Sequence, residues 1–165
     1  MNANVAAAYV EPVVKTIRVK ATPMHAFEVF TANIARWWNP RHSINPTQSP
    51  IQKIVMEPRV GGRWYERGAD GSECEWGKVL TWDPPRRVVL AWQISTQWAY
   101  DATLHTELEV RFEPQGAETV VTLEHRLLER WGEKARETRD MVNGGWGGLL
   151  DRFGAAAEGR PVPAE

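Results

Sequence analysis

From residue 88 onward, apolar and polar residues alternate with the period of a β-strand. The charged positions include Glu107, Glu109, Arg111, Glu124 and Arg126. The positions between them are apolar up to a final histidine, and they are Val88, Leu90, Trp92, Leu108, Val110, Phe112, Val121, Leu123 and His125. Because successive strand residues point to opposite faces, this pattern predicts an antiparallel sheet with one buried and one solvated face.

Turn-forming residues divide the middle of the chain into a meander. Asp70-Gly71 supplies the positive φ angles of a hairpin turn. Pro84-Pro85 forms a second turn, because proline cannot donate to a strand ladder. The predicted strands are three within residues 61–92 and one each at 104–112, 119–127, 51–56 and 13–20. The last of these has the alternation of a half-buried edge strand.

Helical spacing of apolar residues is found in two other regions. Thr22-Pro23 is a favourable start, since the hydroxyl can cap the helix and proline fits its first position. We therefore predict a helix over residues 23–32 and a second short helix over 34–38. A longer helix is predicted over 133–158 from the apolar stripe of Val142, Trp146, Leu149, Leu150 and Phe153.

Four glycines surround Trp146 inside this long helix, at positions 144, 145, 147 and 148. Each costs a helix roughly 0.8–1 kcal/mol relative to alanine. We therefore expect the helix backbone to lie tight against the curved sheet there, with Trp146 inserted into the groove.

The chain reads as one domain over residues 13–158. Residues 1–12 are expected to be a flexible leader and residues 159–165 a disordered tail. The proline-rich loop at 39–50 is too long for a simple connection, which leaves a functional flap or a poorly ordered strap as alternatives.

Nine tryptophans in 165 residues are the compositional outlier, and they supply more aromatic surface than a plain core needs. The net charge of −1 argues against nucleic-acid binding, and no apolar run is long enough for a membrane span. A single cysteine, Cys74, excludes an intrachain disulfide and favours a cytoplasmic location. The four histidines lack metal-ligand spacing, so neither a metal nor a cofactor is predicted.

Several short motifs together carry a family resemblance. They are Pro58–Glu66 (PRVGGRWYE), Trp82–Arg87 (WDPPRR), Thr122–His125 (TLEH) and Gly145-Trp146. In these residues the chain resembles bacterial proteins similar to the activator of the ninety-kilodalton heat-shock protein's ATPase, which belong to the START-like, helix-grip superfamily. The resemblance covers roughly residues 13–158. It implies an α+β fold in which a curved antiparallel sheet wraps a long C-terminal helix and a hollow between them holds an apolar or amphipathic ligand.

The tryptophans are the candidate lining of that hollow. Trp37 and Trp38 are adjacent and point about 100° apart on a helix, so at most one is expected to face inward. Trp38, which is nearer the proline-rich loop, is the one proposed. The proposed set is Trp38, Trp64, Trp92, Trp98 and Trp146. The alternative is that these indoles fill the space between sheet and helix completely.

Three polar residues share the expected inner registers, namely Glu66, Glu75 and His125. If their faces point inward, they would converge and orient the polar head group of a ligand, or act as general acid and base. The alternative is that both glutamates pair with Arg63, Lys78 or solvent, and that His125 is a core residue bonded to backbone.

The sequence therefore favours a cytoplasmic small-molecule binding domain rather than an enzyme. One alternative is an enzyme of the same fold, such as a cyclase, hydratase or hydrolase acting on an apolar substrate. Another is a module that binds a chaperone, although the outer register is mostly charged. A homodimer could form through the edge strand at residues 13–20.

Overall fold

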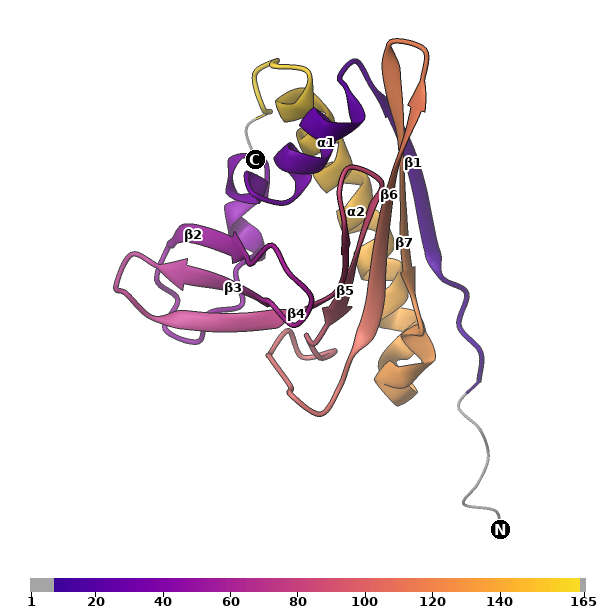
Figure 1. The fold of residues 1–165 in the computed structure, drawn as a ribbon. Coiled ribbons are helices and arrows are strands. Elements are labelled where there is room, and N and C mark those ends of the chain that lie inside the picture. Colours follow the sequence, from indigo (N-terminus) through magenta and orange to yellow (C-terminus); the bar gives the residue numbers. More distant parts are fainter. Residues whose placement is uncertain (1–7, 164–165) are drawn as a thin grey trace.

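A computed structural model of the chain describes residues 8–163. Its seven strands form one antiparallel sheet in the order β1-β7-β6-β5-β4-β3-β2 (Figure 1). The strands are β1 (Val13–Val19), β2 (Ile51–Met56), β3 (Arg63–Gly68), β4 (Glu73–Asp83), β5 (Arg87–Trp92), β6 (Thr106–Gln115) and β7 (Glu118–Arg126). Every strand predicted from the alternation is present, and the predicted edge strand β1 does lie at one edge of the sheet.

Both longer helices lie close to their predicted bounds, and only the short helix predicted over residues 34–38 differs. Helix α1 (Pro23–Phe30) begins as predicted, with the Thr22 hydroxyl accepting from the His25 N–H at 3.1 Å. The predicted second helix is a single 3-10 turn, η1 (Ile34–Arg36). A further 3-10 turn, η2 (Pro40–His42), lies in the following loop, and η3 (Leu128–Lys134) leads into the long helix α2 (Ala135–Ala157).

Helix α2 packs against β1 and α1, so it covers only part of the curved sheet. Figure 1 shows strands β2, β3 and β4 turning away from β5, β6 and β7, so the two parts of the sheet form two walls. This is the helix-grip arrangement expected from the sequence.

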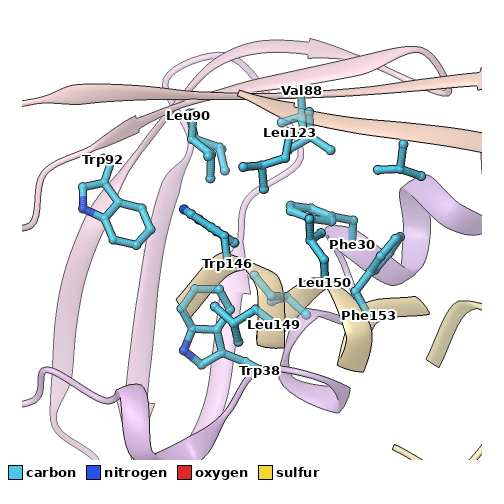
Figure 2. Close-up of a cluster of buried hydrophobic side chains, with 14 of the residues drawn as sticks. Phe30, Trp38, Val88, Leu90, Trp92, Leu123, Trp146, Leu149, Leu150 and Phe153 are labelled. Atoms are coloured by element: carbon cyan, nitrogen blue, oxygen red, sulfur yellow. The ribbon is translucent and has the colours of Figure 1, made fainter. Parts of the chain in front are cut away.

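One end of the interior is solidly packed with aromatic rings. Phe30 lies 5.3 Å from Phe153, and Trp37 lies 5.5 Å from Phe153, measured between ring centroids. The Trp37 indole also donates to the Val29 carbonyl at 2.9 Å. Figure 2 shows Phe30, Leu150 and Phe153 together at this end, with Trp38, Trp92 and Trp146 at the other.

The glycines around Trp146 are not sites of close backbone contact, contrary to our expectation. A Cβ atom placed on Gly144, Gly145, Gly147 or Gly148 would meet no atom within 4 Å. The close approach is about two turns beyond Trp146, where a Cβ on Gly154 would lie 2.8 Å from the Ile17 side chain. The helix therefore stands away from its surroundings near Trp146 and touches the sheet near its C-terminus.

A β-bulge changes the inner register of β4. Trp64 pairs with Gly77 and Tyr65 with Glu75, so Trp76 is an extra residue between them. A bulge of this kind reverses the alternation on one side of the insertion. Counting backward by twos from Val79 therefore assigns Glu75 to the wrong face.

Parts of both terminal segments are within the described residues. Arg139 donates to the Glu11 carbonyl at 2.8 Å, and Val10 is buried, so this part of the predicted leader packs on the domain. At the other end, Val162 is partly buried against the core. Residues 1–7 of the predicted leader and 164–165 of the predicted tail lie outside the described residues.

Candidate ligand-binding site

A cavity of about 380 Å³ lies between α2 on one side and β4, β5 and the loop at residues 39–50, here called the strap, on the other. This volume is within the range of pockets that hold small molecules, about 300–1,000 Å³. Its lining is Trp38, Arg41, His42, Ser43, Ile44, Trp76, Trp92, Ile94, Trp98, Met141, Val142, Gly145, Trp146 and Leu149.

Four buried indoles form the walls of the cavity. Trp38 lies 4.9 Å from Trp76 and 5.9 Å from Trp146, and Trp146 lies 5.8 Å from Trp92, between ring centroids. Figure 2 shows three of these rings, with Trp146 on α2 between Trp38 on the strap side and Trp92 on the sheet. These separations are those of rings in contact with one another, so the indoles form a continuous aromatic lining that suits an apolar ligand.

The cavity opens to solvent at a rim formed by a loop and by α2. Trp98 is 40% exposed and Met141 is 54% exposed. Trp98 adopts a positive φ of 58°, which is uncommon for a bulky residue. Its N–H donates to the Ser95 carbonyl at 2.9 Å, which holds the loop in this conformation.

Two donors in the wall have no acceptor. The indole N–H groups of Trp38 and Trp92 are buried and meet no hydrogen-bond partner among residues 8–163. A buried donor left unmet costs about 1–3 kcal/mol. Such groups are rare in a well-packed core and call for a specific explanation.

The strap supplies the polar residues of the lining, which are Arg41, His42 and Ser43. The Ser43 hydroxyl donates to Oε1 of Glu66. Oε2 of Glu66 accepts from the Ile44 N–H at 2.9 Å and from the Trp76 indole at 2.7 Å. Glu66 is itself fully buried and does not line the cavity, so it acts on this space through Ser43 and Trp76.

Glu75 does not converge with Glu66 and His125. The bulge at Trp76 places Glu75 on the other face of β4, where it forms an ion pair with Arg63. This is the alternative that the sequence left open for Glu75, whereas Glu66 pairs with Ser43 instead.

His125 lies in the core behind the wall of the cavity. Its Nε2 is 2.8 Å from the Thr106 hydroxyl, and its Nδ1 accepts from the Trp146 indole at 3.3 Å. Complete burial lowers the pKa of His125 to about 3, so the ring is neutral. It is a core histidine, as the alternative held, although its partners are side chains and not the backbone.

The structure thus brings four of the eight residues proposed from the sequence to the cavity: Trp38, Trp92, Trp98 and Trp146. Trp64 and His125 lie one layer behind, since Trp64 is 5.4 Å from Trp76 and 5.8 Å from Trp92. Sequence reasoning missed Trp76, which the bulge turns inward, and Ser43, for which the only signal was the length of the loop.

The remaining reactive groups are unremarkable. Burial, with the nearby Glu66 and Glu75 carboxylates, raises the pKa of Cys74 to about 11, so its thiol stays protonated. Within residues 8–163 no three histidine, cysteine or acidic side chains gather as a metal site would require. None of the helices in that range combines the length and apolar character needed to cross a membrane.

A long C-terminal helix held by a curved antiparallel sheet, with an aromatic cavity between them, defines a protein of the helix-grip class. Residues 20–158 match the family model described as Activator of Hsp90 ATPase homolog 1-like protein, and the chain belongs to this family. The resemblance found in the sequence motifs is thereby confirmed.

Solved structures similar to the chain include a synthase and a resistance protein. The anthrahydroquino-γ-pyrone synthase Txn09, solved as a complex with SUM, is 38% identical over 82% of this chain and 88% of that one, with a TM-score of 0.58. CalC of Micromonospora echinospora, a self-sacrificing resistance protein, is 27% identical over 91% and 96% of the two chains, with a TM-score of 0.67.

A third similar structure is a dimer of Aha1 from Colwellia psychrerythraea. It is 19% identical over 90% of this chain and 97% of that one, with a TM-score of 0.63, so it supports the fold. No curated protein sequence matches the chain.

Proposed function

We propose that this protein binds a flat, mainly apolar aromatic small molecule in the cavity between α2 and the sheet. The observation that carries the proposal is the set of four buried indoles around about 380 Å³ of open space. In this proposal Trp38, Trp76, Trp92 and Trp146 contact the rings of the ligand, and Trp98 stands at the entrance. Glu66 and His125 hold other residues in place.

The glycines of α2 allow a direct test. Gly145 lines the cavity, whereas Gly144 is exposed beside it, and neither would clash with an added Cβ. Gly145→Leu should fill the cavity, while Gly144→Leu places the same side chain in solvent. We expect Gly145→Leu to weaken binding of anthraquinone-2-sulfonate by at least about tenfold, equivalent to about 1.4 kcal/mol, and Gly144→Leu to leave it unchanged.

The measurement is quenching of tryptophan fluorescence as the probe is added. The proposal fails if the unmodified protein shows no saturable binding, or if both variants bind as the unmodified protein does. Thermal unfolding of the two variants checks that each is folded.

A second candidate function is catalysis on a polycyclic aromatic substrate in the same cavity. The 38% identity to a γ-pyrone synthase favours it. The residues able to move a proton at the cavity are His42 and Ser43, with Glu66 bonded to Ser43 from behind the lining. Incubating the protein with candidate hydroxylated polycyclic substrates, followed by mass spectrometry, distinguishes turnover from binding alone.

The proposals about partners and cellular location are the ones made from the sequence. A homodimer through the unpaired edge of β1 can be tested by light scattering over a dilution series. A chaperone contact and a cytoplasmic location are further proposals. The first can be tested by co-sedimentation with a purified chaperone, and the second by fractionation of the source cells.

A further inference from the structure

The polar end of the cavity is an ordered hydrogen-bond chain. The Ser43 hydroxyl donates a hydrogen bond to Oε1 of Glu66. The other carboxylate oxygen is engaged by the Ile44 N–H and the Trp76 indole, and the whole glutamate is buried. All three of these groups donate to the Glu66 carboxyl, and the Ser43 hydroxyl is the donor at Oε1, so its hydrogen is directed away from the cavity.

The bonding capacity left on Ser43 is therefore that of an acceptor. A serine hydroxyl has one proton and two lone pairs. Its proton is directed at Glu66, and the Asn45 N–H donates to its oxygen at 3.2 Å. One lone pair remains, on an oxygen made more basic by the carboxylate behind it.

We propose that Ser43 accepts a hydrogen bond from a hydroxyl group on the ligand, so that the cavity selects phenols over the corresponding ethers. This inference rests on the proposed binding function and adds the chemical class of the ligand, a hydroxylated aromatic compound. An ether oxygen at the same place would meet the lone pair of Ser43 without a proton between them. Glu66 is then a positioning residue: by accepting the Ser43 hydrogen, it leaves the Ser43 oxygen as an acceptor toward the cavity.

The test compares 2-naphthol with 2-methoxynaphthalene, which differ only by the methyl group on the oxygen. Calorimetry of the full chain gives the ratio of the two dissociation constants. We expect the unmodified protein to favour 2-naphthol by about tenfold, the size of a neutral hydrogen bond. Ser43→Ala should bring the ratio to about one.

Ser49→Ala is the matched control. Ser49 belongs to the same strap, and its hydroxyl accepts from the Asp70 N–H at 3.0 Å, but it does not line the cavity. This variant removes a strap hydrogen bond of comparable kind and should keep the tenfold ratio.

Glu66→Gln tests whether the direction of the Ser43 hydroxyl hydrogen matters, without removing Ser43. The amide oxygen would keep the two donors at Oε2, which places the amide nitrogen against the Ser43 oxygen. That nitrogen donates, so the Ser43 proton must turn toward the cavity. We expect the preference for 2-naphthol to be lost, and 2-methoxynaphthalene to bind at least as well.

The outcomes separate this inference from the proposed function. Equal binding of both naphthalenes by the unmodified protein overturns the role of Ser43 and leaves the cavity as a binding site. A tenfold ratio that survives Ser43→Ala or Glu66→Gln, in protein with an unchanged thermal transition, also overturns it. If neither compound binds to the unmodified protein, both proposals are overturned.

Discussion

His125 shows how burial fixes both the charge and the tautomer of a single side chain. The Trp146 indole donates to Nδ1, so the ring proton resides on Nε2, which faces the Thr106 hydroxyl. The ring also stacks 4.9 Å from Trp92 between centroids. His125 therefore orients two walls of the cavity without reaching the space itself.

The neutral state of His125 predicts a pH-dependent stability. The folded-state pKa of about 3 lies below the value of 6.5 in the unfolded chain, so below pH 6.5 only the unfolded state binds the proton. The free energy of unfolding should fall with decreasing pH, by up to about 1.4 kcal/mol per pH unit.

Urea unfolding between pH 7.5 and about pH 5, above the range where most carboxylates titrate, measures this slope. His125→Gln should flatten this slope, whereas His25→Gln, at an exposed position, should not. Stability that is constant over this range in the unmodified protein would contradict the assignment.

At the scale of elements, two glycines of α2 lower the stability of the helix although no neighbouring atom requires a glycine there. Gly144 and Gly148 are exposed, and a Cβ on either would meet open space. We expect Gly144→Ala and Gly148→Ala each to raise the free energy of unfolding by about 0.5–1 kcal/mol.

Gly154→Ala is the internal comparison for these variants. It gains the same helix propensity, but its Cβ would lie 2.8 Å from Ile17 Cδ1, so we expect no net stabilisation. Chemical denaturation of the three variants ranks them. Equal effects at all three positions would show that helix propensity alone determines the outcome.

The strand ends could be predicted because their signals are local. Asp70-Gly71 and Pro84-Pro85 mark turns by their own backbone preferences, and the strands end where these residues stand. The bulge at Trp76 has no such signal, since it depends on pairing with Trp64 and Tyr65 in the neighbouring strand. That single inserted residue is why Glu75 was assigned to the wrong face.

The order of the strap could not be predicted for a related reason. The sequence left a flap and a disordered segment as alternatives, and the structure holds the strap by side chains far away in the chain. Asn45 donates to the Ser72 hydroxyl at 2.7 Å, and Ser43 and Ile44 donate to Glu66. Contacts of this kind become visible only when the fold brings the segments together.

For the whole molecule, the interior divides into a packed end and a hollow end. The aromatic cluster of Phe30, Trp37 and Phe153 fills the space where α2 meets α1 and β1. The cavity lies toward β4, β5 and the strap. Local opening should therefore be easier at the hollow end, where fewer side chains pack.

Hydrogen exchange should reveal this division. We expect slow exchange in the central strands β6 and β7, and faster exchange in the edge strand β2 and in residues 41–45 of the strap. Saturation with anthraquinone-2-sulfonate should slow exchange in the strap and in the loop near Trp98, with little change in β7. A uniform response along the chain would contradict the division.

Charged and hydroxyl-bearing groups reach the cavity from one short contiguous stretch, Arg41–Ser43, whereas the indole walls come from β4, β5, α2 and the segment just before the strap. The polar contacts of the cavity can therefore be changed by replacing residues 41–43 alone, while the sheet and α2 stay as they are. Grafting this stretch from one member of the family onto another, together with the residue that stands at the Glu66 position, offers a route to retarget such a protein toward a different aromatic guest.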